Sequence, residues 1–221
     1  MNIYMLVIQL FVLLFAITVH EAAHGWMASR FGDDTARSMG RVTLNPVAHI
    51  DPFGTVLLPL LLVLMKAPVF GWAKPVPVNP LNLRNPRKDN LWISAAGPMA
   101  NILVAVFCLF AIILIKALNP NALALLMRRG GPAGGLHPLG SLILILFYGA
   151  LINMYLVVFN LIPVPPLDGS GVLMGLLSEE SAQKFDRLRP YGFLIVIGLI
   201  YLGVLSAIIQ PVQNLILNIV F

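Results

Sequence analysis

Charged residues are scarce in this sequence, and their scarcity excludes most classes of protein. Asp, Glu, Lys and Arg make up 10% of the 221 residues, whereas apolar residues make up 59% and the mean hydropathy is +0.90. About a quarter of the residues of a soluble globular protein are charged, and a disordered chain is highly charged and poor in apolar residues. The composition excludes both classes and predicts an integral membrane protein.

Cysteine is almost absent, since Cys108 is the single one and it lies inside an apolar run. One cysteine cannot form a disulfide framework or a cysteine-ligated zinc site. The apolar runs lack period-2 alternation, which favours helices as the structures that satisfy their own backbone in a bilayer. The sequence therefore predicts an all-α integral membrane protein. Its net charge of +5 indicates basic loops against anionic lipid headgroups rather than a nucleic-acid partner.

Long apolar runs predict a polytopic helical bundle of about four full spans, because roughly 20 apolar residues cross a bilayer as a helix. A further run, 53–65, is shorter and contains Pro59, so we expect a short or re-entrant helix there. We leave open whether the last of the four spans extends through Pro211 to the C-terminus. The four predicted spans cover residues 3–28, 91–118, 139–162 and 191 to about 209.

The positions of Lys and Arg choose between two topologies for this bundle. If 53–65 does not cross, eleven of the fourteen basic residues lie on one side of the membrane, whereas the split is six against eight if it crosses. Because cytoplasmic loops carry the excess of Lys and Arg, the first topology is favoured. It predicts a multi-pass protein of the cell membrane, with a cytoplasmic basic side and both termini outside.

Two polar stretches between the spans, 37–43 and 73–78, predict a small β element at the membrane surface. The second stretch holds two prolines, which cannot lie inside a helix. We find no internal repeat and no appended soluble domain, so we expect one membrane-embedded domain over residues 1–221. Its catalytic core would cover about 1–178 and its C-terminal helix about 190–218.

Residues 20–24 have the sequence His-Glu-Ala-Ala-His, which is the pattern H-E-x-x-H. Residues four apart share one face of a helix, so His20 and His24 can hold one metal ion. Glu21 would lie about 100° round the helix, where it can accept a proton from a metal-bound water without being a ligand. Ionisable groups in an apolar span are costly and usually functional. A metal site is therefore favoured over an idle polar patch.

A catalytic zinc site needs three protein ligands and an open position. Most of the remaining carboxylates lie in polar linkers, which leaves Asp51 and Asp168 as candidates. Asp168 follows a proline-rich break after the span 139–162, and irregular backbone at membrane depth is tolerated where it lines a cavity. This break predicts a proline-broken helix. Two roles for Asp168 stay open from the residues alone, a third metal ligand and the cap of a helix.

These residues, with Asn160 eight positions before Asp168, resemble the site-2 protease family of intramembrane zinc metalloproteases. Residues 97–101 (GPMAN) are similar to that family's G-P-x-x-N motif. The runs 45–55 (NPVAHIDPFGT) and 70–78 (FGWAKPVPV) resemble the short bacterial and archaeal subgroup that lacks PDZ and CBS domains. The resemblance extends over most of the chain.

The resemblance implies an intramembrane zinc metalloendopeptidase that hydrolyses a peptide bond within or near a transmembrane segment, as in regulated intramembrane proteolysis. His20, His24 and Asp168 would bind one Zn²⁺ per chain, and Glu21 would activate the zinc-bound water. Asn160 would stabilise the oxyanion or bind the substrate backbone. The substrate would be a single-span or other membrane protein in the lipid bilayer, and the active site would face the cytoplasm.

Five further residues are candidates for the substrate cavity. His49 and Asp51 would line it, and a structural turn capped by Asp51 is an equal alternative. Asn101 is expected to hydrogen-bond across helices near the site rather than to touch substrate. Val76 and Val78 lie in a predicted edge strand, where they could pair with an unwound substrate by strand addition. The oligomeric state is left open.

Two other functions fit part of this pattern. A zinc-binding membrane transporter or scaffold without peptidase activity would use the metal ligands but needs no general base such as Glu21, and transporters often show repeated halves. A zinc protease that acts on soluble peptides at the membrane surface would keep the chemistry and change the substrate. Glu21 favours a protease over the transporter or scaffold, and a series of substrates of different length would separate the two kinds of protease.

Overall fold

The computed structural model describes residues 3–65, 71–126, 129–130 and 135–221, and most of them are helical. Large apolar side chains such as Phe107 and Phe110 face outward, 66% and 63% exposed, as lipid-facing residues do. The chain is thus a multi-pass membrane protein, and the predicted all-α class is confirmed. The helices long and apolar enough to cross a membrane are α1 (Ile3–Arg30), α4 (Pro86–Leu118) and α5 (Pro138–Asn160).

Shorter elements connect and cover these three helices. The run 53–65, predicted to be short or re-entrant, forms η2 (Pro52–Leu57) and α3 (Leu58–Leu64). Neither element is long enough to be a straight span. Besides α8 and α9, the short elements are α2 (Thr35–Ser38), η1 (Pro46–His49), η2 (Pro52–Leu57), α3 (Leu58–Leu64), η3 (Pro80–Asn82), η4 (Ala122–Leu126), β1 (Arg129–Gly130), β2 (Gly135–Leu136), α6 (Asp168–Leu176), α7 (Glu179–Asp186) and η5 (Arg189–Tyr191).

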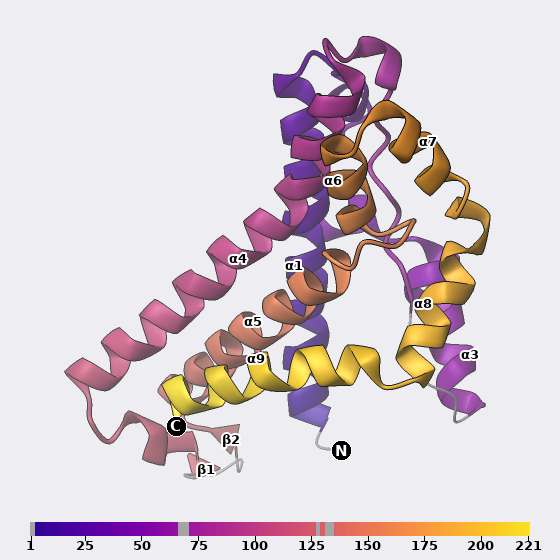
Figure 1. The fold of residues 1–221 in the computed structure, drawn as a ribbon. Coiled ribbons are helices and arrows are strands. Elements are labelled where there is room, and N and C mark those ends of the chain that lie inside the picture. The colour runs from indigo at the N-terminus through magenta and orange to yellow at the C-terminus, as the bar shows by residue number, and fades with distance from the viewer. Residues whose placement is uncertain (1–2, 66–70, 127–128, 131–134) are drawn as a thin grey trace.

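The three long helices contact one another, and the shorter helices pack on them. Figure 1 shows the start of α4 beside α1 at the end of the molecule that also holds α6 and α7. From there α4 runs to the opposite end, and α9 lies beside α5. α6 packs on α4, so residues from α1, α4 and α6 meet in one region.

The C-terminal helix α9 is held against α4 and α5 by an apolar cluster and by Lys116. The Lys116 ammonium donates to the carbonyls of Ile219 at 3.3 Å and Val220 at 2.8 Å. Carbonyls at a helix C-terminus lack partners within the helix, and a cation there is favourable to the helix dipole. The buried members of the cluster are Cys108, Ile112, Ala150, Leu151, Ile216 and Val220.

The last predicted span is a bent pair of helices rather than one straight helix. α8 (Gly192–Tyr201) ends the helical stretch Glu179–Tyr201, and α9 (Val204–Val220) is bent by 61° relative to that stretch. Gly203, between them, has a φ of +74°, a left-handed conformation that glycine adopts readily. The span predicted over 191–209 therefore bends at 202–203, and the predicted four spans are reached if the bent pair counts as one.

The predicted β element at 37–43 and 73–78 is also wrong. The first stretch overlaps α2, and residues 71–79 are extended without forming a strand. In segment 71–79, the N–H of Trp72 donates to the Gly54 carbonyl and the N–H of Lys74 donates to the His49 carbonyl. The two prolines of this segment have no N–H to donate. The described residues pair in a sheet only as β1 and β2, two residues each, between α4 and α5.

Candidate metal centre

Helices α1 and α6 bring three metal-ligating side chains together. His20 Nε2 lies 3.0 Å from Asp168 Oδ2, and His24 Nε2 lies 3.3 Å from Asp168 Oδ1. One ligand atom of each residue lies within 4.8 Å of the others. The side chains are 8%, 12% and 18% exposed for His20, His24 and Asp168, so little water reaches them. The structure thus places the three predicted ligands around one point.

The chain reaches Asp168 through a proline-rich turn that follows α5. α5 ends at Asn160, and residues 161–167 contain three prolines before α6 begins at Asp168. Gly169 lets this turn lie against the start of α6, because a Cβ at Gly169 would collide with the main chain of Leu161. The break in the helix therefore directs the carboxylate of the first α6 residue toward α1.

Gly97 of α4 lies directly against the two imidazoles. A Cβ built on Gly97 would stand 2.5 Å from His24 Nε2 and 2.7 Å from His20 Nε2. Cβ atoms do not approach other heavy atoms this closely, so any side chain here would displace a ligand. The first residue of the GPMAN motif therefore forms a wall of the candidate metal centre.

The second nitrogen of each imidazole is held by an oxygen atom of α4. His24 Nδ1 lies 2.7 Å from the Ile93 carbonyl, and His20 Nδ1 lies 2.6 Å from Asn101 Oδ1. A main-chain carbonyl only accepts, so His24 Nδ1 carries a proton, which leaves Nε2 as the nitrogen that can bind a metal ion when the ring is neutral. The Nε2 atoms of both histidines face the Asp168 carboxylate, whose Oδ2 is buried without a hydrogen-bond partner among the described residues.

This arrangement fits a metal cation. The carboxylate supplies negative charge, and the two imidazoles supply nitrogen atoms that a divalent cation between them would take as ligands. Two histidine nitrogens and one carboxylate oxygen, with the outer nitrogens hydrogen-bonded, form a ligand set that zinc takes in catalytic sites, where a fourth position stays open. His20, His24 and Asp168 could therefore hold a zinc ion in this position.

Glu21 lies between the two histidine ligands in sequence but turns to the extended segment 71–79. Its Oε2 accepts the N–H of Val76 at 3.0 Å, and its side chain is partly buried. This hydrogen bond fixes one oxygen of the carboxylate. Val78, two residues further along the segment, packs instead against the buried cluster of Ala28, Leu83 and Ile93.

The remaining candidates lie in different settings. Asn160, at the end of α5, donates from Nδ2 to the Leu156 carbonyl of its own helix at 3.0 Å. Asp51 accepts the N–H groups of Phe53 and Gly54, which is the geometry of a helix cap. His49 is 2% exposed and approaches the Thr43 carbonyl with Nε2 at 3.0 Å.

Sequence reasoning missed two contacts that support the ligands. The predicted hydrogen bond of Asn101 across helices is present, but the sequence did not identify His20 as its partner. It also did not link Gly97 to the imidazoles, although Gly97 and Asn101 lie on one face of α4, four residues apart. The spacing of the GPMAN motif carries this signal. Its partner on α1 lies far away in sequence, so the pairing could not be derived without the fold.

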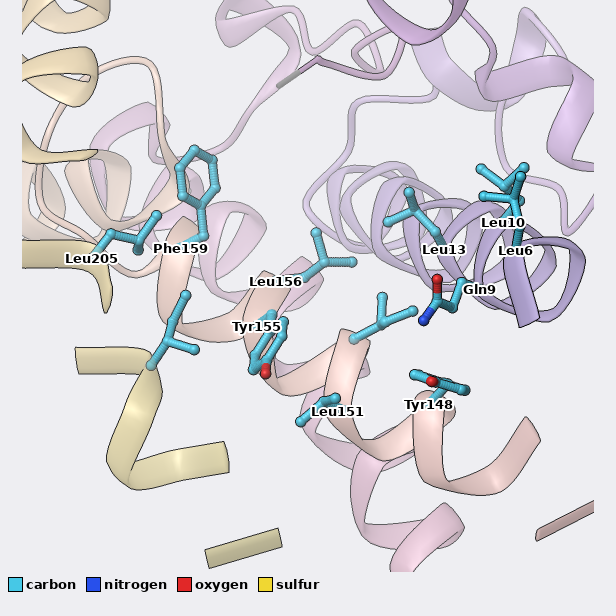
Figure 2. A pocket seen from close by; sticks show the side chains of 12 residues that line it. Leu6, Gln9, Leu10, Leu13, Tyr148, Leu151, Tyr155, Leu156, Phe159 and Leu205 are labelled. Atoms are coloured by element: carbon cyan, nitrogen blue, oxygen red, sulfur yellow. The ribbon is translucent and has the colours of Figure 1, made fainter. Parts of the chain in front are cut away.

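Two apolar grooves flank α1. The lateral groove has a volume of about 520 Å³ and lies between α1, α5 and α9, with Gln9, Tyr148 and Tyr155 as its polar lining residues (Figure 2). The smaller site groove, of about 380 Å³, is lined by α1 residues around Ala22 and Ala23, by Ala100 of α4 and by residues 42–44. The site groove lies beside the α1 turn that carries the H-E-x-x-H motif.

Comparisons with known proteins agree with this geometry. Residues 8–204 match Peptidase family M50. The chain is 36% identical over 202 residues to a Bacillus subtilis (strain 168) protein named "Putative zinc metalloprotease YwhC", covering 91% of this chain and 84% of that protein. It is 29% identical over 187 residues to "Putative zinc metalloprotease Rip2" of Mycolicibacterium smegmatis, covering 85% of this chain and 64% of that protein. No solved structure matches the chain significantly.

Proposed function

Because the chain belongs to peptidase family M50 and is a membrane-embedded zinc metalloprotease, we propose that it cleaves within the membrane. The proposed reaction is hydrolysis of a peptide bond within or near a transmembrane segment of a membrane protein. The observation that carries the proposal is the convergence of His20, His24 and Asp168 at the end of a helix apolar enough to span a bilayer. A ligand set in this place serves substrates that lie in the membrane.

His20, His24 and Asp168 would bind one zinc ion per chain. Zinc bound in such a site polarises a carbonyl and lowers the pKa of a water molecule to about 7. Glu21 would take the proton that this water loses and deliver it to the leaving amine. The Val76 N–H holds Oε2 of Glu21, which orients the carboxylate and leaves Oε1 for the proton.

Asn160 would donate a hydrogen bond to the carbonyl oxygen of the bond that is cut. An asparagine amide has two N–H donors, and one of them is taken by the Leu156 carbonyl. The second donor remains for the substrate, where charge develops on oxygen during attack. His49, Asp51, Asn101, Val76 and Val78 stay candidates for the substrate cavity, and among them Val76 is the one that contacts Glu21.

The proposed setting is the cytoplasmic membrane, with both termini outside and the site facing the cytoplasm. The bias of Lys and Arg supports this orientation. It also lets water reach the metal from the cytoplasmic side, which hydrolysis requires. One domain over residues 1–221 would hold the catalytic core and the C-terminal helix, and its substrates would be single-span or other membrane proteins.

A transporter or scaffold that binds zinc is the alternative. Such a protein would use the three ligands and would have no need for a carboxylate beside them. Glu21, next to His20 and oriented by Val76, favours the peptidase. Within the described residues, His20, His24 and Asp168 are the one cluster that could hold a metal ion, whereas a transport path usually offers several polar sites.

Glu21→Gln is the variant that tests the proposal. Wild type and variant are purified in detergent or liposomes, zinc is measured by elemental analysis, and cleavage of a single-span protein is followed. We expect about one zinc in both proteins and cleavage by the wild type alone, because glutamine cannot take the proton. Cleavage that survives the substitution, or a wild type that holds no metal, would overturn the mechanism.

A further inference from the structure

Two buried asparagines connect the metal centre to the interior of the helix bundle. Asn101 of α4 and Asn153 of α5 are both 0% exposed. Asn101 Oδ1 contacts His20 Nδ1 at 2.6 Å, and Asn101 Nδ2 donates to Asn153 Oδ1 at 2.6 Å. Asn153 makes no contact with the metal ligands in this chain of hydrogen bonds, and it acts on His20 only through Asn101.

Two main-chain carbonyls fix the direction of every hydrogen bond in this chain. Asn153 Nδ2 donates to the Gly149 carbonyl at 2.7 Å, and Asn101 Nδ2 donates to the Ala16 carbonyl at 3.1 Å. Because a carbonyl only accepts, neither amide can be reversed without facing an acceptor with an acceptor. Asn101 therefore turns its oxygen to His20, and His20 Nδ1 must carry the proton.

From this polarity we infer that Asn153 is a positioning residue for the metal centre. With its own amide anchored on Gly149, Asn153 orients Asn101, which in turn holds His20 in the tautomer whose Nε2 lone pair faces the metal position. His24 needs no such relay, since Nδ1 of His24 donates directly to the Ile93 carbonyl. The inference rests on the proposed metal site but not on the proposed peptidase activity.

Loss of Asn153 would leave Asn101 with an unsatisfied donor in a region that water does not reach. Its amide would then be held by the Ala16 carbonyl alone, and the oxygen that faces His20 would be less firmly oriented. Groups that orient a ligating histidine commonly change metal affinity by about 10- to 100-fold when they are removed. Since Asn153 acts one step further out, we expect the lower end of that range.

The first test measures zinc affinity of the metal-free full-length protein in detergent, by competition with a chelator. Asn153→Leu, which keeps the number and branching of the side-chain heavy atoms and removes both hydrogen bonds, should weaken zinc binding about tenfold. Ile143→Ala is the matched control, because Ile143 is a 1% exposed residue of the same helix outside the relay. The control should loosen α5 and leave zinc affinity within about twofold, given its separation from the ligands.

Two further variants separate positioning from a merely structural role. Asn153→Asp should retain zinc affinity, because a buried neutral carboxyl can donate to Gly149 and accept from Asn101. The double variant of Asn101→Leu with Asn153→Leu should bind zinc no more weakly than Asn101→Leu alone. The visible spectrum of Co²⁺ in the site should change in Asn153→Leu and stay unchanged in Ile143→Ala, since it reports ligand geometry.

The inference is overturned if Asn153→Leu binds zinc like the wild type, or no worse than Ile143→Ala does. It is also overturned if the losses of the two asparagines add in the double variant, because Asn153 would then act independently of Asn101. A wild type that binds zinc but cleaves no substrate would overturn the proposed peptidase function. The zinc affinities of the variants would still decide the role of Asn153.

Discussion

Gly97 of α4 packs directly against the two histidine ligands on α1. Gly97→Ala should abolish zinc binding, because its Cβ would stand 2.5 Å from His24 Nε2 and 2.7 Å from His20 Nε2. Displacing a ligand by about 1 Å costs on the order of 100-fold in activity. Elemental analysis of the purified variant, with cleavage of a single-span substrate, measures both effects.

Gly198→Ala is the control for this substitution. Gly198 lies in α8, where a Cβ would meet nothing within 4 Å, so the same chemical change should leave zinc content and cleavage as they are. If Gly97→Ala held zinc as the wild type does, the close approach of α4 to the ligands would be contradicted.

At the residue scale, the sequence predicted what is local and missed what is distant. His20, Glu21 and His24 follow from the spacing of one helix. Without the family resemblance, the sequence could not distinguish a metal-ligand role of Asp168 from a helix-cap role. The position of Asp168 depends on how a proline-rich turn folds back. Gly97 and Asn153 support the ligands through contacts between helices. No pattern within a single segment encodes such contacts.

At the scale of elements, the extended segment 71–79 contacts Glu21, the acidic residue of the H-E-x-x-H motif, through the Val76 N–H. Val76→Pro should lower cleavage about tenfold or more, because it removes the N–H that holds Glu21, and a hydrogen bond to a charged group contributes about 1.5–3 kcal/mol. Zinc content should be unchanged, since Glu21 is not a ligand. Val76→Ala, which keeps the N–H, is the control, and equal loss of zinc and cleavage in Val76→Pro would contradict the assignment.

The same segment is tied to the end of α1 by Asp33. Asp33 is 0% exposed and accepts hydrogen bonds from the Asn79 N–H at 2.7 Å, from Asn82 Nδ2 at 2.8 Å and from Thr35. Burial by itself would raise the pKa of Asp33, but the hydrogen bonds from Thr35, Asn82 and Asn79 lower it below its usual value. The folded state therefore binds this proton less readily than the unfolded state does.

This shift in pKa predicts a loss of stability in acid. A carboxylate with a lowered pKa stabilises the fold above its unfolded pKa of about 3.9, and the contribution is lost as the pH falls through the folded value. The midpoint temperature of thermal unfolding should decrease as the pH is lowered through this acid range. In Asp33→Asn, the midpoint temperature should decrease less over the same range. Asp34→Asn, which changes the exposed neighbouring residue, should leave the acid dependence of the wild type unchanged. An unchanged acid limb in Asp33→Asn would refute the role of Asp33.

Helices were predictable as apolar runs, but their bends and the absent strands were not. Hydropathy is continuous from α8 into α9, and it carries no information about the left-handed φ of Gly203 that separates them. The proline-containing segment 71–79 is extended, as its sequence indicated. Its hydrogen bonds go to side chains and to carbonyls of η1 and η2 instead of a partner strand. The choice among such partners depends on tertiary contacts that the sequence alone does not give.

For the whole molecule, the orientation in the membrane decides where water and substrate meet the metal. Three exposed positions test it in a Cys108→Ser background: Arg84→Cys, Asn121→Cys and Gln183→Cys. Because the basic linkers are expected in the cytoplasm, an impermeant thiol reagent on intact cells should label Asn121→Cys alone. In inverted membrane vesicles, the other two should be labelled instead.

Arg84→Cys carries the most information of the three positions, because it follows the run 53–65 that forms η2 and α3. Neither of these elements is long enough for a straight span, so Arg84 should lie on the same side as Gln183. Labelling of Arg84→Cys from outside would mean that the run crosses, which removes the excess of basic residues on one side. The extended segment 71–79, which contacts Glu21, would then have to reach the site from the opposite face, and the cytoplasmic placement of the site would fall with it.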